Sequence, residues 1–477
     1  MSVERVIVTA HRLGQTTSEC DLSAYIDGQS AVAVDQRLSV PYVDLPDGAQ
    51  RLVIQATPRS PNLWPLRAEF DVSDSDKVTK TAGPDAAQFE VVPSAVSGGR
   101  ALHHVRVHLG RVRDVTQRSN DILRPSTGVD FRLSPKEINT VDADTPLTGS
   151  TLNVTKLEVD PNATESVVLE LANVDTPQLI AVHWPSGIAP SAESGPTPFL
   201  IYFHPRVGQN AAYYSQGQYP FAKQYLFSGF WAYLDYRHDP LVDVGADKQG
   251  PWYKGLPYQI SHGGKDVVLV LPLPRLVRDL PPARRQPANE IGVFLDAEEV
   301  HQVLLEIQEF FFRRAGIYDK ALLGVSRAAM AGFSAGTIFI QAFLGRSGNL
   351  RNAFCLNVLK EVYFFEPTRG ILGVPQATSW ARTGEDDKVV RLYTANPAPG
   401  ARTLLRQADP GDPTESSDGR RSAIVLGMDV WRRAVAAAAD GDGGGGTELS
   451  RLVDGQAVHQ LISATMLGHA VRRSGFG

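Results

Sequence analysis

Short, unbroken apolar runs recur along the chain from about residue 150 onward, and stretches with helical periodicity separate them. The runs are LNVTKLEV, QLIAVHW, PFLIYFHP, KDVVLVLPLP, RAAMAGF, EVYFFEP, KVVRLYTA and ELSRLVDG. A strand that is apolar on both sides has to be covered on both sides, and parallel strands need a crossover, usually a helix, between them. The pattern therefore predicts an α/β domain with a mostly parallel sheet and helices on both faces.

One of the intervening helices is marked at both ends. Asp296 and Glu299 have the spacing of a capping box, and Gly316 stands where a helix would stop. The residues between them include one apolar face: Val300, Val303, Leu304, Ile307 and Phe311. This spacing predicts a helix from 297 to about 315 that packs its apolar face against the sheet.

The first 145 residues have a different pattern of apolar and polar residues. Their apolar runs are short and alternating, as in RVIVTAHRL, AVAVDQRLSV, RLVIQATP, AEFDVS and HHVRVHLGRV, and turn residues interrupt them. Alternation of this kind is typical of antiparallel strands with one buried face, so we expect an all-β, sandwich-like domain. Because the segment 124–150 is rich in turn residues, we expect a β-rich domain at 1–145 and the α/β domain at 146–477.

Composition excludes several classes of protein. With 47 basic and 52 acidic residues the net charge is −5, which gives no basic surface for nucleic acid. The two cysteines argue against a disulfide framework or a cysteine zinc site. The first residues lack the apolar core of a signal peptide, and the apolar stretch 328–345 contains Gln341 and three glycines. We therefore expect a soluble, cytoplasmic protein with no transmembrane segment.

The stretch 332–336, GFSAG, places Ser334 between two glycines. A small-residue strand candidate precedes it and an apolar helical run follows it. A nucleophile elbow requires this strand–turn–helix setting, because the turn lifts the serine hydroxyl out of the sheet and the helix N-terminus provides N–H donors. The nearby GVSRA at 324–328 lacks the second glycine and enters a strand. The pattern indicates Ser334 as a catalytic nucleophile; the alternative is a serine in a tight buried turn.

On the order of its elements and on the GFSAG motif, the C-terminal two-thirds of the chain resembles the α/β-hydrolase superfamily, in particular its serine esterases and lipases. The resemblance implies a nucleophile, an acid and a histidine in that order along the chain. Only His459 and His469, of eleven histidines, follow Ser334. His459 follows the strand candidate ELSRLVDG in the loop where the resemblance places the base, whereas His469, the alternative, falls inside a helical run.

The acid has several candidates, because fourteen carboxylates lie between Ser334 and His459. The acid must hold the imidazole tautomer, so it should stand on a turn at a strand end. The strand candidate EVYFFEP ends at Glu366, a position that some lipase-like members use. Most members carry the acid after the next strand, where this chain offers Asp409 and Asp412, both distant from the strand end.

The resemblance also implies an oxyanion hole with two backbone N–H donors. Ala335, which follows the nucleophile, is one of them. The second should come from the loop after FLIYFHP, and because Pro205 has no N–H, Arg206 is the donor we expect. The segment after that loop is dense in aromatic residues, and we nominate Tyr213 and Tyr214 for the substrate pocket; packing on the sheet is the alternative for the others.

Other polar groups in the sequence point to no metal or cofactor. His103, His104 and His108 cluster on one strand candidate, but Arg106 interleaves them, which predicts a solvated strand face rather than a metal site. The glycine-rich stretches match neither a phosphate-binding loop nor a dinucleotide fingerprint. We therefore expect no cofactor.

These observations lead to the hypothesis of a carboxylester hydrolase that works through an acyl-enzyme intermediate. Its partner would be a small-molecule or polymeric ester, and the sequence does not indicate an oligomeric state. Two alternatives stay open. A thioesterase or a peptidase would use the same triad, and a catalytically inactive, hydrolase-like binding or assembly protein would keep the fold alone.

Overall fold

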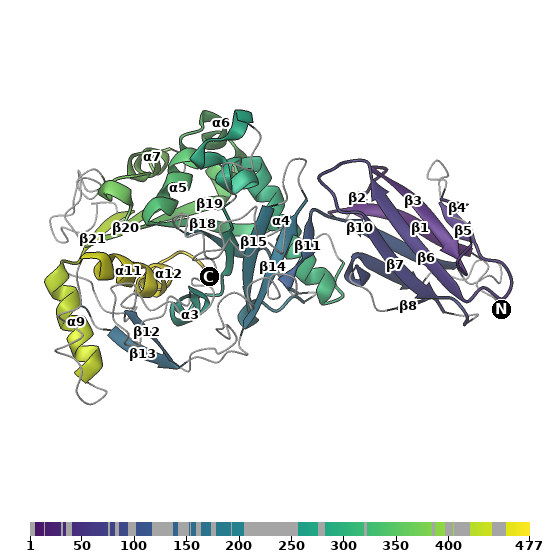
Figure 1. Ribbon diagram of the computed structural model, residues 1–477, viewed down its shortest axis with the longest axis horizontal. Coiled ribbons are helices and arrows are strands. Elements are labelled where there is room, and N and C mark those ends of the chain that lie inside the picture. The colour runs from purple at the N-terminus through teal and green to yellow at the C-terminus, as the bar shows by residue number, and fades with distance from the viewer. Residues whose placement is uncertain are drawn as a thin grey trace.

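The computed structural model describes residues 5–116, 137–141, 152, 154–158, 164–172, 178–204, 256–274, 282–395, 404, 420–440 and 455–477, with short gaps inside the longer ranges. Figure 1 shows an all-β unit at the N-terminal end, in purple and blue, beside a larger unit in which helices surround one extended sheet.

The larger unit is built on a nine-stranded mixed sheet. In spatial order its strands are β11 (Val112–Asp114), β14 (Thr164–Leu171), β15 (Gln178–Pro185), β17 (Val268–Pro272), β16 (Thr197–Phe203), β18 (Val325–Phe333), β19 (Leu359–Phe365), β20 (Val389–Thr394) and β21 (Arg421–Val425). The strands from β17 to β21 are parallel, whereas β15 is antiparallel to both of its neighbours. The predicted, mostly parallel sheet is thus confirmed.

Two separate hydrophobic cores lie on opposite faces of this sheet. Along β18, Ala329, Ala331 and Phe333 join one core, and Ala328 and Met330 join the other, as the two-residue period of a strand requires. The first core includes side chains of α3 (Leu256–His262), α9 (Met428–Asp440), α11 (Gly455–Thr465) and α12 (Leu467–Arg472). The second includes those of α4 (Ala297–Arg314), α5 (Thr337–Leu344) and α7 (Val374–Trp380). Helices therefore cover both faces, as predicted.

Helix α4 begins and ends where its capping residues indicate. The Asp296 side chain accepts hydrogen bonds from the backbone N–H groups of Glu298 at 3.0 Å and Glu299 at 3.3 Å. Gly316, just beyond the last turn, has a φ of 76°, a conformation that glycine adopts without steric strain. The predicted apolar face is buried in the second core: Val300, Val303, Leu304, Ile307 and Phe311.

One of the predicted strands differs from the structure, and another lies almost entirely outside the described residues. The run LNVTKLEV contains β13 (Val154–Glu158), whose partner among the described strands is β12 (Glu137–Val141), in a separate two-stranded sheet. In its place, the alternating TESVVLEL forms β14 of the main sheet. For ELSRLVDG, residues 448–454 lie outside the described residues, and Gly455 already begins α11.

The N-terminal unit consists of two five-stranded sheets that share one core. One sheet contains β1 (Arg5–Arg12), β2 (Gln15–Thr16), β5 (Tyr42–Asp44), β9 (Phe89–Pro93) and β10 (Leu102–Leu109); the other contains β3 (Cys20–Ile26), β4 (Val32–Ala33), β6 (Arg51–Pro58), β7 (Leu66–Asp71) and β8 (Thr79–Lys80). The expectation of antiparallel pairing is wrong for β1 and β10, which are parallel. No hairpin joins these two strands, so turn geometry does not set their direction.

The chain crosses from one unit to the other at Gly110 and Arg111. The run HHVRVHLGRV, read as one strand, is divided there into β10 in the N-terminal unit and β11 at the edge of the nine-stranded sheet. The predicted domain boundary near 145 falls in residues 142–151, outside the described residues, and it stays a prediction.

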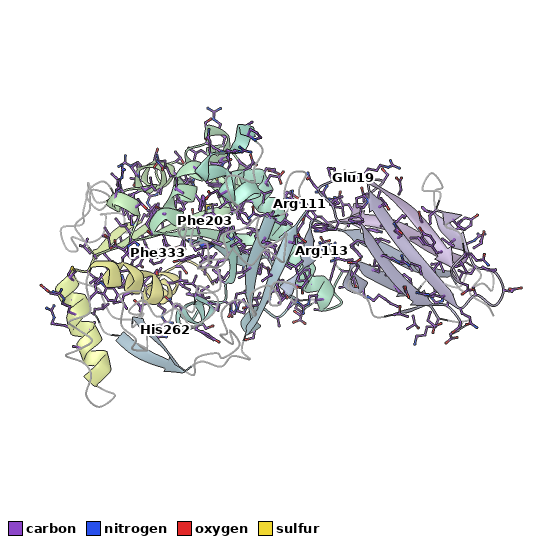
Figure 2. The ribbon with its side chains drawn as sticks, viewed as in Figure 1. Glu19, Arg111, Arg113, Phe203, His262 and Phe333 are labelled. Carbon is purple, nitrogen blue, oxygen red and sulfur yellow. The ribbon has the colours of Figure 1, made fainter. Side chains whose placement is uncertain are left out.

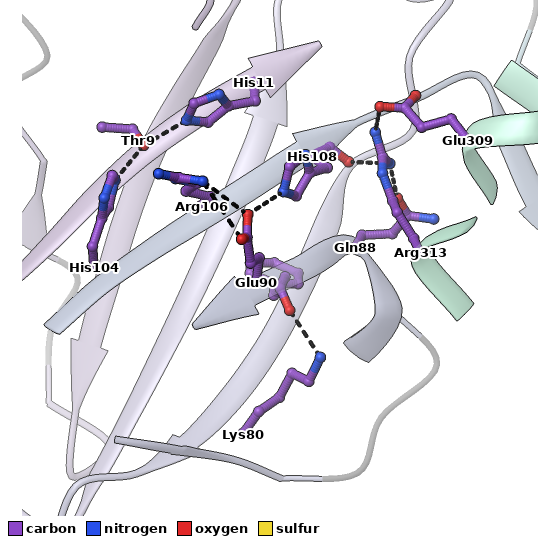
Figure 3. A network of polar contacts seen from close by, with 11 residues as sticks. Thr9, His11, Lys80, Gln88, Glu90, His104, Arg106, His108, Glu309 and Arg313 are labelled. Carbon is purple, nitrogen blue, oxygen red and sulfur yellow. Dashed lines mark hydrogen bonds and ion pairs between the residues drawn. The ribbon is translucent and has the colours of Figure 1, made fainter. Parts of the chain in front are cut away.

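A network of polar contacts joins the two units (Figure 3). Arg313 of α4 donates to the backbone oxygen of His108 at 3.1 Å and to the side chain of Gln88, and it pairs with Glu309 on its own helix. The ring of His108 stacks on Tyr318 with a centroid separation of 5.0 Å. Side chains from both units therefore meet in a buried polar interface.

The prediction of a solvated strand face for the histidines of β10 is wrong at His108. His108 is only 3% exposed and its Nε2 lies 3.1 Å from Glu90, so this part of the strand is not solvated. Burial, reinforced by the charge of Arg313, lowers the pKa of His108 to about 2. The Thr9 hydroxyl hydrogen-bonds to the Nε2 atoms of His104 and His11. The prediction failed at His108 because Tyr318 and Arg313 of α4 cover this end of the strand.

The helices in the described part of the chain are too short or too polar for any of them to cross a membrane.

Candidate active site

Ser334 lies in a strained turn between a strand and a helix. It follows Phe333, the last residue of β18, and the 3₁₀ turn Ser334–Gly336 leads directly into α5. Its φ is 50°, in the left-handed region that residues other than glycine rarely adopt. Strain of this kind persists where the surrounding structure holds it, and it is frequent at active sites. The small-residue strand before Ser334 and the apolar helix after it, both predicted from the sequence, are confirmed.

Both glycines of the motif are closely packed, and the packing at Gly336 leaves no room for a side chain. A Cβ atom on Gly332 would lie 3.0 Å from Cδ1 of Ile340 and 3.2 Å from Cα of Thr337. A Cβ atom on Gly336 would clash with the backbone carbonyl oxygens of Phe203 and His204. The contacts of Gly336 are with main-chain atoms that cannot move aside, whereas the nearest atom to Gly332 is the end of the Ile340 side chain, which would have to shift by a few tenths of an ångström. The glycines let the strand, the turn and the helix approach each other closely.

Three parallel strands end beside one another at this edge of the sheet. Phe333 is paired with Phe365 of β19, and Gly332 is paired with Phe203 of β16. The next residues along these strands are Ser334, Glu366 and His204. The sheet register therefore brings Ser334 and Glu366 to the same edge, although 32 positions separate them in the sequence.

Glu366 is held by the backbone at the end of the neighbouring strand β20. Its N–H donates to the Tyr393 carbonyl oxygen at 2.8 Å, and its Oε1 accepts from the N–H of Ala395. Like Ser334, Glu366 has a positive φ, in this case 47°. Two strained residues that are not glycine thus follow adjacent strands, and both carry side chains that acyl-transfer chemistry uses.

His459 is the histidine that meets Glu366. Its Nδ1 lies 3.7 Å from Oε2 of Glu366, which is an ion-pair distance rather than a hydrogen bond. The His459 ring also packs against Phe333, with 4.6 Å between the ring centroids, so it stands beside the residue that precedes Ser334. The His459 side chain is 24% exposed, and that of Glu366 is 15% exposed.

The local structure around His459 differs from the expected loop. His459 lies in the second turn of α11, which begins at Gly455. Val458, Leu461 and Ile462 are buried in the core with the i, i+3, i+4 spacing of a helix, so the helical pattern begins earlier than the run LISATML indicated.

His469, the alternative base, is fully buried in α12. Its Nδ1 lies 3.0 Å from the Tyr393 hydroxyl, within hydrogen-bond distance. Tyr393 also accepts from Glu366 through its main chain, so this residue, which sequence reasoning did not single out, supports the site from β20. The sequence did indicate the strand that carries Tyr393, because the apolar run KVVRLYTA ends at Ala395, two residues after it.

The remaining predicted site residues divide into two groups. Ala335, the one that the structure describes, lies in the turn after Ser334 and is partly buried. The others lie outside the described residues: Arg206, Tyr213, Tyr214, Asp409 and Asp412.

The strand order resembles that of the α/β-hydrolase superfamily. Numbered from β14, the strands stand in the order 1-2-4-3-5-6-7-8, with only the second antiparallel, and Ser334 follows the fifth. Glu366 directly follows the sixth strand, and His459 lies in α11, beyond α9 and the eighth strand, which preserves the chain order of nucleophile, acid and base.

Comparisons with known proteins gave the following results. No protein-family model and no curated protein matches the sequence. Similar solved structures include the siderophore hydrolase EstB from Aspergillus nidulans, with 16% identity and a TM-score of 0.29 over 66% of this chain and 95% of that one. They also include an arylesterase, with 11% identity and a TM-score of 0.28 over 71% and 92% of the two chains.

A third similar structure is the feruloyl esterase module from Clostridium thermocellum in complex with sinapinate, with 10% identity and a TM-score of 0.31 over 69% of this chain and 95% of that one. Likenesses at this level support no statement about activity. The resemblance to α/β-hydrolases rests on the strand order and on the strand–turn–helix at Ser334.

Proposed function

We propose that the protein is a serine hydrolase that cleaves carboxylic esters through an acyl-enzyme intermediate. The observation that carries the proposal is the meeting of three features at one sheet edge. Ser334 stands in a strained turn at the start of α5, the His459 ring packs on the preceding residue, and Glu366 lies 3.7 Å from His459. A serine hydroxyl needs such a base, because it is a weak nucleophile until an imidazole takes its proton.

The orientation of His459 supports a division of roles between its two ring nitrogens. Nδ1 is the nitrogen nearest Glu366, which leaves Nε2 to accept the proton of Ser334. The carboxylate would keep the proton on Nδ1 and stabilise the imidazolium that forms during the reaction. Glu366 is suited to this task because two backbone contacts, with Tyr393 and Ala395, fix its position.

The reaction would proceed in two halves. In the first, Ser334 Oγ attacks the ester carbonyl carbon, His459 takes the serine proton, and the backbone N–H groups of Ala335 and Arg206 stabilise the oxyanion. Collapse of this intermediate expels the alcohol, which leaves with the proton from His459. In the second half, His459 removes a proton from water, the resulting hydroxide attacks the acyl-enzyme, and the acid is released as Ser334 regains its proton.

The test is turnover of p-nitrophenyl esters from acetate to palmitate by the wild type and by Ser334→Ala. We expect the variant to lose about 10⁴-fold or more in kcat with at least one ester, because the nucleophile and base act as a unit. Ser326→Ala is the matched control, since Ser326 is an exposed serine of the same strand. An esterase activity that survives in Ser334→Ala would contradict the assignment. Activity on thioesters or peptides alone would favour the related hydrolase classes.

A further inference from the structure

The imidazole of His459 makes one polar contact and one aromatic contact. Its Nδ1 lies 3.7 Å from Oε2 of Glu366, which is beyond hydrogen-bond distance. Its ring packs on the ring of Phe333, with 4.6 Å between the centroids and 37° between the planes. Among the described residues, the His459 side chain has no hydrogen-bond partner. The orientation of the proposed base therefore depends on its aromatic contact as well as on the carboxylate.

Phe333 is a rigid support for this ring. It is the last residue of β18, in the interior of the nine-stranded sheet, and it is paired with Phe365 of β19. Its side chain is fully buried in the core that also contains Val458, Leu461 and Ile462 of α11. Figure 2 labels Phe333 beside that helix. The same core thus fixes the helix that carries His459 and the ring on which its imidazole packs.

The two contacts restrict different movements of the imidazole. A histidine side chain has several staggered rotamers, and the torsion of its ring is broad. The Phe333 ring packs on the imidazole and limits the tilt of its plane, whereas the Glu366 carboxylate lies at the Nδ1 edge. Centroid separations of about 4.5–7 Å are those at which aromatic pairs stabilise a structure beyond the area they bury. Together the contacts leave Nε2 at the edge away from the carboxylate.

We propose that Phe333 is a positioning residue, which holds the plane of the His459 imidazole so that Nε2 can take the Ser334 proton. This role rests on the proposed function and adds a residue to it. Because Phe333 is fully buried, it acts through His459 and does not touch the substrate. A direct effect on Ser334, the next residue in the chain, is the alternative that the experiment has to separate.

The kinetic experiment compares Phe333→Leu with the wild type on the p-nitrophenyl ester that the wild type turns over best. Leucine keeps an apolar side chain and removes the ring. We expect kcat to fall about fivefold at an unchanged KM, because the lost contact orients the base and binds no substrate. If Phe333→Leu does not fold, Phe333→Met, with a longer apolar side chain, replaces it.

Phe199→Leu is the matched control. Phe199 is a fully buried phenylalanine of β16, in the core on the other face of the sheet. Its substitution should lower the thermal midpoint as Phe333→Leu does and leave kcat within about twofold of the wild type. An equal fall of kcat in both variants would show a general effect of core packing and would overturn the proposal.

A double-mutant cycle separates an effect on His459 from an effect on Ser334. In a His459→Ala background, Phe333→Leu should not lower the residual turnover further, because no imidazole is left to position. The same fivefold fall in that background (about as large as in the wild type) would assign the effect to the turn at Ser334. That result would overturn the proposal.

A spectroscopic readout tests the contact without relying on turnover. In protein with carbon-13-labelled histidine, the ring C–H signals of His459 are assigned, among eleven histidines, by their loss in His459→Ala. The ring current of Phe333 shifts these signals, so we expect them to move in Phe333→Leu and to stay in place in Phe199→Leu. Signals that do not move in Phe333→Leu overturn the proposal. Shifted signals in a protein that turns over no ester would locate the failure in the proposed function rather than in the contact.

Discussion

Glu306 on α4 makes the stability of the protein depend on pH in a direction that can be worked out from its surroundings. Its side chain is 1% exposed, and it faces Arg111 at 3.5 Å and Arg12 at 3.9 Å, both from the other side of the interface. Burial raises the pKa of Glu306 to about 7, Glu309 contributes in the same direction, and the two arginines oppose the rise.

Because the folded-state pKa of Glu306 is above its unfolded value of 4.5, the folded protein binds this proton more tightly than the unfolded chain. Its contribution to stability is therefore full below pH 4.5 and is lost as the pH rises through 7. Each pKa unit corresponds to about 1.4 kcal/mol, so the whole shift corresponds to roughly 3.4 kcal/mol. About 2.5 kcal/mol of this falls between pH 5 and pH 8.

Glu306→Gln removes the titration while keeping the size of the side chain. We expect the stability difference between wild type and variant to change by about 2.5 kcal/mol from pH 5 to pH 8, with the wild type losing stability relative to the variant. Urea unfolding at four pH values measures this difference, and Glu193→Gln, at an exposed loop position, is the control. Parallel pH profiles for the wild type and Glu306→Gln, or a difference of the opposite sign, would refute the reasoning.

Three further predictions concern the candidate site. Gly336→Ala should lower stability by about 1–3 kcal/mol and abolish ester turnover, because the new Cβ would meet the Phe203 and His204 carbonyl oxygens; thermal unfolding and kcat measure the two effects. Glu366→Gln should lower kcat about 10³–10⁴-fold, and a larger loss in Asp409→Asn or Asp412→Asn would transfer the role of acid to that residue. Tyr393→Phe should destabilise the fold by about 1–2 kcal/mol, because His469 loses a buried hydrogen bond, while kcat stays within about twofold of the wild type; a large fall in kcat would show that the hydroxyl acts in the reaction.

The parts of the fold that local pattern determines could be predicted from the sequence. Strands β15 to β20 are covered on both faces of the sheet. Their sequences are therefore mainly apolar on both sides, and this pattern can be recognised without the structure. The capped helix α4 and the strand–turn–helix at Ser334 likewise depend on residues that are close together in the chain. The order Ser334, Glu366, His459 was available from the sequence, but the pairing of β18 with β19 is what brings the first two to one edge.

The remaining features depend on contacts between distant segments. Strand β14, which the sequence did not single out, contains Glu170, which is buried and pairs with Arg113 of β11 at 2.6 Å. His108 is buried because the end of α4 and Tyr318 cover its strand, which no pattern within β10 indicates. The parallel pairing of β1 with β10 joins residues almost one hundred positions apart. Hydrophobic periodicity describes the burial of one element and does not identify the partner that buries it.

The most direct measurement of the central claim is the intact mass of the protein after treatment with a fluorophosphonate probe, followed by peptide mapping. An activated serine in an elbow attacks the probe, whereas a serine in an ordinary buried turn does not. The account predicts a single adduct on Ser334 in the wild type and in Ser326→Ala, and none in Ser334→Ala or His459→Ala. An unmodified wild-type protein, or an adduct that maps to another residue, would contradict it.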